Sequence, residues 1–145
     1  MDEAAARAVF EQALATQEPE FGRFFVARFL ELEVGFTADS CVVELPVRDF
    51  LFNPQGSLHG GVIATVLDIA MGHLIQHSVG AATTLEMKTQ FLKAVRGGRL
   101  RAEGRFLRRG RRVFFMEARL HDDSGDLVAA ATSTWQLVPP PTPKE

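Results

Sequence analysis

The segment that most constrains the fold is residues 59–78, a long apolar stretch with one carboxylate, Asp68, near its middle. A turn-rich run, residues 53–61, precedes it and ends in the pair Gly60-Gly61. This length and composition predict a helix that is apolar on most sides and that a sheet must cover. An acid on such a helix costs free energy unless it is paired or used in chemistry. Asp68 is therefore the first candidate for a functional residue.

The bulk composition is that of an ordinary globular domain. The 145 residues are 46% hydrophobic and carry a net charge of −2. We therefore expect one domain over residues 1–145, with neither a nucleic-acid partner nor a membrane partner. The single cysteine, Cys41, excludes an internal disulfide. The acidic start lacks the basic and apolar regions of a signal peptide, and we expect a cytoplasmic protein.

Periodicity and turn residues predict the order of the elements. A helix is expected over residues 3–16, inside an N-terminal helical segment, residues 1–25. Strands are expected over residues 28–37, 40–47, 83–95, 99–108, 112–121 and 127–138, and a loose tail over 139–145. Gly97-Gly98 and Arg109-Gly110 predict hairpins between the later strands. This order predicts an α+β fold in which an antiparallel sheet wraps around the apolar helix.

One face of the apolar helix carries small and polar residues. Gly61, Thr65, Asp68 and Gly72 follow the spacing that places residues on one side of a helix. Two interpretations remain open. The face packs tightly against another element with Asp68 paired inside, or it lines a path for a substrate with an acid in its wall.

The glycines at the start of this helix are a second candidate site. Bare backbone N–H groups at a helix N-terminus bind a negatively charged oxygen. Gly60 and Asp68 are eight residues apart, so their Cα atoms lie roughly 12 Å apart along one helix. The two cannot act on the same carbonyl carbon from one chain. If both are catalytic, the site is built from two subunits around a two-fold axis.

These residues carry a resemblance to a known family. The pattern consists of Asn53, Gly56, Leu58-His59-Gly60-Gly61, Asp68, Ala70 and Gly72, followed by residues 84–87 and 91–94. Over about residues 30 to 138 the chain resembles the hotdog-fold thioesterases of the 4-hydroxybenzoyl-CoA thioesterase-like superfamily. It is most similar to the acyl-CoA thioesterases of the phenylacetate-degradation type.

The resemblance implies a hotdog fold, a curved antiparallel sheet around a long central helix, in a homodimer that often pairs into a tetramer. It implies that Asp68 is the catalytic carboxylate, as general base or as nucleophile. The Gly60 N–H would bind the thioester oxygen, Asn53 would position the thioester and Thr84 would orient the attacking water. Coenzyme A enters as part of the substrate, and neither a further cofactor nor a metal is implied.

Other residues are candidates for binding the substrate. His59, Gly61 and Thr65 surround the start of the helix, where His59 either shapes the turn or acts as a base. Lys93, Arg109 and Arg111 belong to a basic region that either holds the phosphates of coenzyme A or is a solvated turn.

The remaining candidates favour structural roles. His73 and His77 lack the glutamate of a metalloprotease motif between them, so they are expected to be ordinary residues near the end of the helix. Cys41 has no ionisable partner nearby in the sequence and is expected to be a buried small residue.

The sequence thus predicts an enzyme that hydrolyses an aromatic or medium-chain acyl-CoA to a free acid and coenzyme A. An acyl dehydratase on the same fold is an alternative, but it requires a catalytic histidine placed against the acid. A non-catalytic module that binds acyl-CoA is another alternative, which the buried Asp68 disfavours.

Overall fold

The apolar segment forms one helix, and the other elements are arranged around it. The computed structural model describes residues 1–139, and residues 140–145 of the expected tail lie outside the described part. Its elements are α1 (Glu3–Thr16), α2 (Phe25–Phe29), β1 (Glu33–Phe36), β2 (Ser40–Pro46), a 3-10 turn (Asp49–Leu51), α3 (Gly60–Ser78), β3 (Ala82–Phe91), β4 (Arg99–Arg109), β5 (Val113–Asp122) and β6 (Leu127–Leu137).

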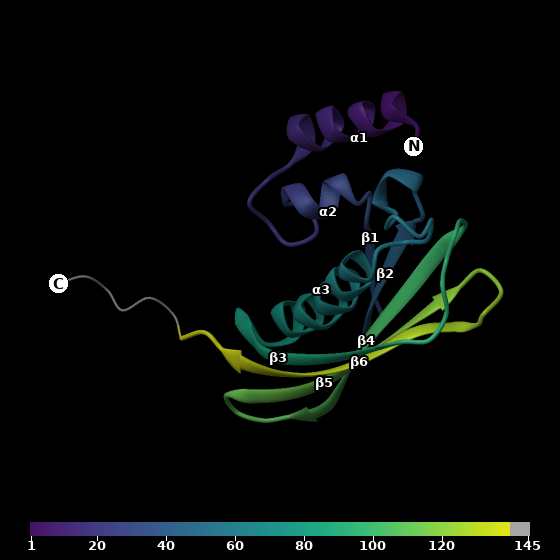
Figure 1. Cartoon of the computed structure of the whole chain (residues 1–145). Coiled ribbons are helices and arrows are strands. Elements are labelled where there is room, and N and C mark those ends of the chain that lie inside the picture. Colours follow the sequence, from purple (N-terminus) through teal and green to yellow (C-terminus); the bar gives the residue numbers. More distant parts are fainter. Residues whose placement is uncertain (140–145) are drawn as a thin grey trace.

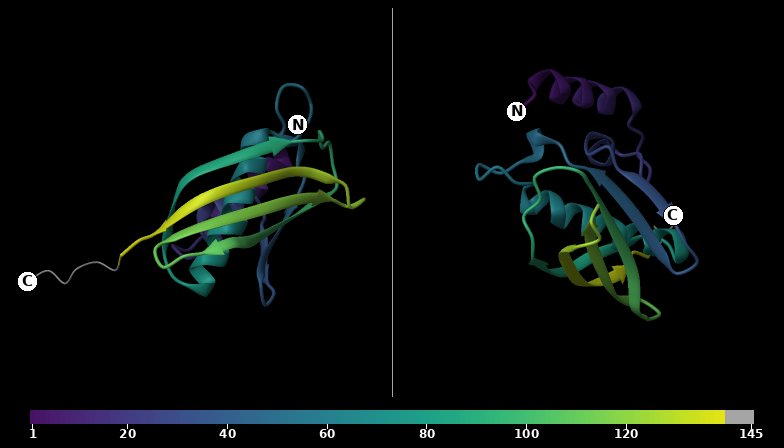
Figure 2. Two further views of the ribbon diagram at one scale, coloured as in Figure 1. Left: turned by 90° about the horizontal axis from the view of Figure 1, so that it is seen from below. Right: turned by 90° about the vertical axis from the view of Figure 1, so that its right-hand side faces the viewer.

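The six strands form one antiparallel sheet that curves around α3. The strand order is β1-β2-β4-β5-β6-β3, and every neighbouring pair is antiparallel. Helix α3 contacts β2, β3, β4, β5 and β6, and Figures 1 and 2 show it crossing the inner side of the sheet. Helix α1 lies beside α2. The α+β class and the hotdog arrangement expected from the sequence are confirmed.

The expected hairpin at Gly97-Gly98 is wrong. Strand β3 ends at Phe91 and pairs with β6, while β4 pairs with β2 and β5. The β5–β6 hairpin therefore lies between the two strands that the glycines were expected to join. Gly98 instead turns the chain into β4 with φ of +83°, and its carbonyl accepts a hydrogen bond from the Val47 N–H. The Arg109-Gly110 hairpin is confirmed.

The expected strand over residues 28–37 is also wrong in its first half. Residues 25–29 form the short helix α2, and β1 covers only Glu33–Phe36. The chain reverses at Glu31, which has a φ of 53°. Ala27 and Leu30 are both buried at helical spacing, so packing of this face against the core stabilises a helical turn where composition suggested a strand.

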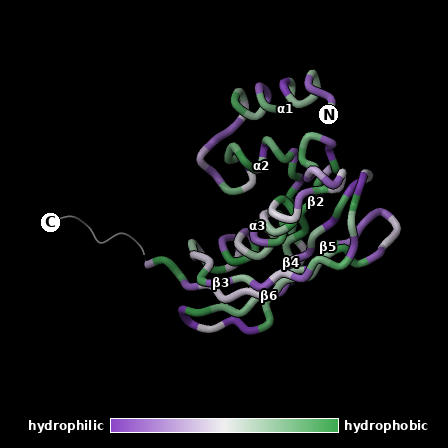
Figure 3. Tube along the Cα trace, viewed as in Figure 1, coloured by the Kyte–Doolittle hydropathy of each residue, from purple (hydrophilic) through white to green (hydrophobic). Residues whose placement is uncertain are grey.

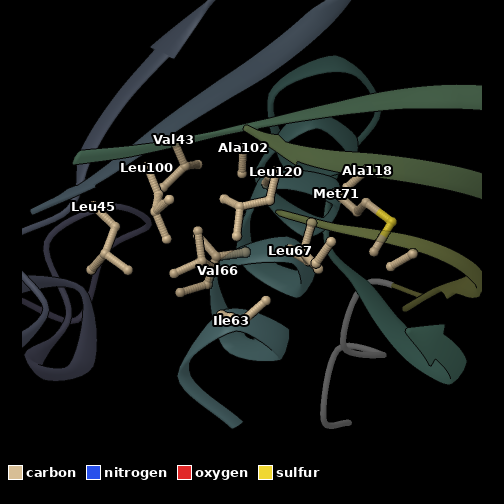
Figure 4. Close-up of a cluster of buried hydrophobic side chains, with 14 of the residues drawn as sticks. Val43, Leu45, Ile63, Val66, Leu67, Met71, Leu100, Ala102, Ala118 and Leu120 are labelled. Carbon is tan, nitrogen blue, oxygen red and sulfur yellow. The ribbon is translucent and has the colours of Figure 1, made fainter. Parts of the chain in front are cut away.

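The core lies between α3 and the inner face of the sheet. Figure 4 shows side chains from both layers in contact, with Ile63, Val66, Leu67 and Met71 from the helix and Val43, Leu45, Leu100, Ala102, Ala118 and Leu120 from the strands. Burying each large apolar side chain contributes roughly 1.5–3 kcal/mol. The strands alternate as expected, and Figure 3 shows hydrophobic and hydrophilic residues following each other along β4 and β5.

Strand β4 lies very close to the helix at Gly104. A Cβ atom added there would lie 2.6 Å from the carbonyl oxygen of Ala70, which belongs to the backbone of α3. A contact this short cannot be relieved by rotating a side chain. The distance between the sheet and the helix therefore depends on the absence of a side chain at this position.

We predict that Gly104→Ala lowers the free energy of unfolding by about 1–3 kcal/mol, because the helix and the strand must move apart. Urea denaturation followed by circular dichroism measures the change. Gly97→Ala is the matched control, since a Cβ at this exposed glycine meets nothing within 4 Å. Equal stability of the two variants would contradict the assigned contact.

Candidate active site

Asp68 lies half-buried in the middle of α3, opposite the edge strand β3. The hydroxyl of Thr84 donates a hydrogen bond to its Oδ1 over 3.0 Å. Burial raises the pKa of Asp68 above the ordinary value of 3.8, and the hydrogen bond from Thr84 opposes part of that rise. The carboxylate thus has a single side-chain partner within the described residues, and its charge is only partly compensated.

A β-bulge in β3 places Thr84 against the helix. Thr84 pairs with Trp135 and Glu86 pairs with Thr134, so Leu85 has no opposite residue in β6. The bulge changes the alternation, and the inward positions are Thr84 and then Met87. Glu86 faces outward and its carboxylate accepts a hydrogen bond from the Thr134 hydroxyl over 2.7 Å. Bulges often direct a side chain in this way beside functional sites.

Asp68 and Thr84 line a cavity of about 450 Å³. The other walls come from α3, from the start of β3, from Trp135 of β6 and from the segment between α1 and α2. These lining residues are Ile69, Gly72, His73, Ala82, Thr83, Trp135, Pro19, Glu20, Phe21 and Phe24. The cavity wall is thus rich in apolar and aromatic residues, and Asp68 and Thr84 are the acid and the hydroxyl in it that bond to each other. Such a combination binds an apolar group while it directs a polar group at one point.

The absence of a side chain at Gly72 lets the Trp135 ring pack closely against α3. A Cβ atom at Gly72 would lie 2.7 Å from Cη2 of Trp135, so the indole ring rests directly on the helix. Its Nε1 donates to the Ser133 hydroxyl over 2.7 Å, which fixes the ring. The face therefore packs closely at Gly72 and lines a cavity at Asp68.

The start of α3 has one occupied and one unoccupied backbone donor. His59 caps the helix, because its Nδ1 accepts a hydrogen bond from the Gly61 N–H over 2.9 Å. Among residues 1–139, nothing accepts from the Gly60 N–H. His59 thus makes the contact expected of a residue that shapes the turn, and within residues 1–139 the Gly60 N–H is a donor without an acceptor at the positive end of the helix dipole.

The other candidates near this end make local contacts. The Thr65 hydroxyl donates to the Gly61 carbonyl over 2.9 Å. The Asn53 side chain closes its own loop, since its Oδ1 accepts from the Gln55 N–H over 2.9 Å and its Nδ2 donates to the Ser57 hydroxyl over 3.2 Å. These residues stand at the N-terminal end of α3, whereas Asp68 and Thr84 stand about two turns further along. A single chain does not bring the two groups together.

The basic candidates lie away from the cavity, and two of them already form ion pairs or a hydrogen bond with other residues. Lys93 forms ion pairs with Asp122 at 2.6 Å and Asp126 at 2.7 Å. Arg109 donates to the Ser78 carbonyl at the end of α3 over 2.9 Å and lies over a phenylalanine ring. Arg111 has no hydrogen bond or ion pair within residues 1–139. None of the three lines the cavity that holds Asp68.

Several lining residues were missed by the analysis of the sequence. Phe21 and Phe24 belong to a connecting segment, and Trp135 lies on the last strand. His73, expected to be an ordinary helix residue, forms part of the wall. The spacing of Gly72 and His73 along the helix was visible in the sequence, but nothing in it indicated which distant aromatic residues would cover them.

Two further observations concern the cysteine and the helices. Cys41 is fully buried, and burial raises the pKa of its thiol to about 12, so it is the buried small residue expected and not a nucleophile. Among the residues that the structure describes, no helix is long and apolar enough to span a bilayer.

The chain is similar in sequence to known esterases and thioesterases. The sequence pattern of the thioesterase superfamily matches residues 55–129. The protein SSO2140 of Saccharolobus solfataricus, whose name provisionally calls it an esterase, is 33% identical over 119 residues, covering 80% of this chain and 81% of that protein. The medium/long-chain acyl-CoA thioesterase YigI of Escherichia coli is 28% identical over 99 residues, covering 57% of this chain and 64% of YigI.

Solved structures agree with this assignment. The structure of the BH2602 protein of Bacillus halodurans, determined with CoA, has a TM-score of 0.87 against this chain. The match covers 97% of this chain and 95% of BH2602. Because the two sequences are 24% identical, this similarity supports the fold alone. The structure of a phenylacetic acid degradation-related protein of Ralstonia eutropha is 29% identical in sequence and has a TM-score of 0.73. The match covers 89% of this chain and 99% of the Ralstonia chain. The chain therefore belongs to the thioesterase superfamily and is a thioester hydrolase with the hotdog fold.

Proposed function

We propose that this protein hydrolyses acyl-CoA thioesters of aromatic or medium-chain acids to the free acid and coenzyme A. The observation that carries the proposal is the half-buried Asp68, held by Thr84 in the wall of an apolar cavity. The names of YigI and of the Ralstonia protein support the two acyl classes. Phe21, Phe24 and Trp135 give the cavity a surface suited to an aromatic ring or a hydrocarbon chain.

In the proposed reaction the C–S bond of the thioester breaks and water supplies the new C–O bond. Asp68 acts either as a general base that takes a proton from water or as a nucleophile that forms a transient anhydride. Both routes use the charged carboxylate, whose pKa burial has brought closer to neutral pH. Thr84 holds the carboxylate and, in this proposal, helps to orient the water.

The oxyanion donor proposed for this reaction is the Gly60 N–H of a second subunit. A preorganised backbone donor aimed at the developing negative charge is worth about 3–4 kcal/mol of barrier. The Gly60 N–H suits this task because it has no acceptor within residues 1–139. We therefore propose a homodimer, paired into a tetramer, with sites shared between subunits. Asn53 and His59 would shape the loop and the helix start that present this donor.

For coenzyme A, Arg111 is the basic candidate whose side chain is available for a phosphate. Lys93 and Arg109 would have to exchange their present contacts for the nucleotide. Gly61 and Thr65 remain candidates for contact with the substrate on the exposed face at the start of α3.

We predict that Asp68→Asn lowers kcat by at least about a hundredfold, because the amide keeps the shape but cannot accept the proton. The melting temperature should stay equal or rise. The pKa of Asp68 is raised in the folded state, so above that pKa the charged group costs stability, and the neutral amide removes this cost. Thiol release and thermal denaturation measure the two effects. Asp39→Asn, at an exposed turn residue, controls for the loss of one charge. A stable Asp68→Asn enzyme with wild-type kcat would refute the catalytic role of Asp68.

We predict that Thr84→Val moves the acid limb of the kcat/KM profile to higher pH. The valine cannot donate a hydrogen bond to the charged carboxylate, so the pKa of Asp68 rises further. Initial rates across the acid range measure the shift. Thr132→Val makes the same change at an exposed position of β6 and should leave the limb in place. A shift of the acid limb to lower pH would contradict the hydrogen bond assigned from Thr84 to Asp68.

Shared sites make a mixing experiment possible. Gly60→Pro removes the proposed donor N–H at the first helical position, where proline is tolerated. We predict that Gly60→Pro and Asp68→Asn are each inactive, and that refolding them together restores about a quarter of the activity, since random pairing gives half mixed dimers with one intact site each.

The matched control for the proline is Gly60→Ala, which keeps the N–H. It should lose less activity than Gly60→Pro, although its Cβ would lie 3.3 Å from the Phe91 ring. Failure of the mixed sample to recover any activity would refute a site that combines Gly60 of one subunit with Asp68 of the other.

A further inference from the structure

Two cavities follow each other along α3. The part of the helix that lines the first cavity runs from Asp68 to His73. The part that lines the second cavity, also of about 450 Å³, runs from His73 to His77. Each volume is within the range of pockets that hold small organic ligands. An acyl group whose thioester carbonyl lies at Asp68, and whose other atoms fill the first cavity, therefore points toward the second.

The boundary between the two cavities consists of Phe21 and His73, the residues that line both. Their rings pack edge to face, with centroids 5.0 Å apart and planes at 74°, an arrangement that aromatic rings favour. His73 is 5% exposed and also lies against the Phe24 ring, so it is fixed within the wall. Phe21, by contrast, is 56% exposed. The Phe21 ring is therefore the part of this boundary that can be changed without disturbing the core.

A closed turn between α1 and α2 holds Phe21 at the boundary. The Glu18 N–H donates to the Arg23 carbonyl over 2.8 Å, and the Phe24 N–H donates to the Glu20 carbonyl over 3.0 Å. The side chains of Glu18 and Arg23 also form an ion pair at 2.5 Å. None of these contacts uses the Phe21 side chain, so the turn keeps its bonds when that ring is removed.

The distance from Asp68 to the boundary gives the length of acyl chain that fits. The helical rise from Asp68 is about 7.5 Å to His73 and about 12 Å to Gln76. The three backbone bonds of an extended residue span at most about 3.6 Å, so an extended chain advances roughly 1.2 Å per bond. The first cavity thus takes acyl groups of about six to eight carbons, and the second would take about four more.

Methylenes on the two sides of the boundary contribute differently to binding. A methylene that leaves water for an apolar cavity strengthens binding about fourfold. Beyond the Phe21 ring, a further methylene of the same chain stays in water and gains nothing. The second cavity has apolar surface from Leu32, Val34 and Phe36, which becomes available to the chain only when the ring is absent.

We infer that Phe21, packed on His73, sets the length of the acyl group by separating the cavity at Asp68 from the cavity beyond it. The boundary selects acyl groups of up to about eight carbons, because longer chains gain nothing from their added methylenes. This inference rests on the proposed acyl-CoA hydrolysis and specifies its substrates.

The test measures kcat/KM by thiol release from straight-chain acyl-CoAs of four to fourteen carbons, with the full-length protein. In the wild type we expect kcat/KM to rise up to about eight carbons and then to stop rising. In Phe21→Ala the rise should continue for about four more carbons. The ratio of the twelve-carbon to the eight-carbon substrate should therefore increase at least about tenfold over wild type.

Two further variants test the role of the ring. Phe21→Trp keeps the boundary closed and should not extend the length limit. Phe115→Ala is the matched control, because it removes a ring that is 42% exposed and lines neither cavity, and it should keep the wild-type profile. Calorimetric titration with the free acids measures the same limit without turnover, so the test still holds if Phe21→Ala loses activity.

The outcomes separate the boundary from the reaction. Thiol release with the same length profile in Phe21→Ala and wild type overturns the inference alone. An equal extension in Phe115→Ala or Phe21→Trp, or a wild-type rise that continues to fourteen carbons, also overturns it. Absence of thiol release from every acyl-CoA refutes the proposed function, and the inference with it.

Discussion

Burial of α3 is the constraint on which the rest of the structure depends. The helix is apolar on most sides, and the sheet covers only the side that contacts β2 to β6. The remaining side must be covered by other parts of the chain. Phe21 and Phe24, from the segment between α1 and α2, approach this side around His73. Cavities remain along this side, one lined by both rings and the other by Phe21.

This incomplete cover explains where a carboxylate can be placed on so apolar a helix. Asp68 lies where the edge strand β3 meets the open side, so it is half-buried and not enclosed. Full burial would keep the group protonated, and full exposure would leave its pKa near 3.8. At the boundary between sheet and cavity the carboxylate is partly buried, and the hydrogen bond from Thr84 opposes part of the rise in its pKa.

Features encoded by local periodicity could be predicted from the sequence, and features set by distant packing could not. Helix α3, strand β2 and strands β4 to β6 follow from their own patterns, as does the face that carries Asp68. The position of β3 at the sheet edge depends on the insertion of a later hairpin. The bulge at Leu85 and the cover of the cavity by Trp135 likewise depend on partners far away in the chain.

The distribution of unfavourable groups argues that one side of α3 is reserved for a ligand. A partly compensated carboxylate lines one cavity on this side, and three buried polar atoms without a hydrogen bond within residues 1–139 belong to residues that line the adjoining cavity. On the sheet side, the Ser133 hydroxyl and the Trp135 indole are both hydrogen-bonded. A chain that satisfies polar groups on one side of a helix could do so on the other. These groups lower the stability of the protein without ligand. Their presence along one path is consistent with a substrate that restores the lost free energy when it binds there.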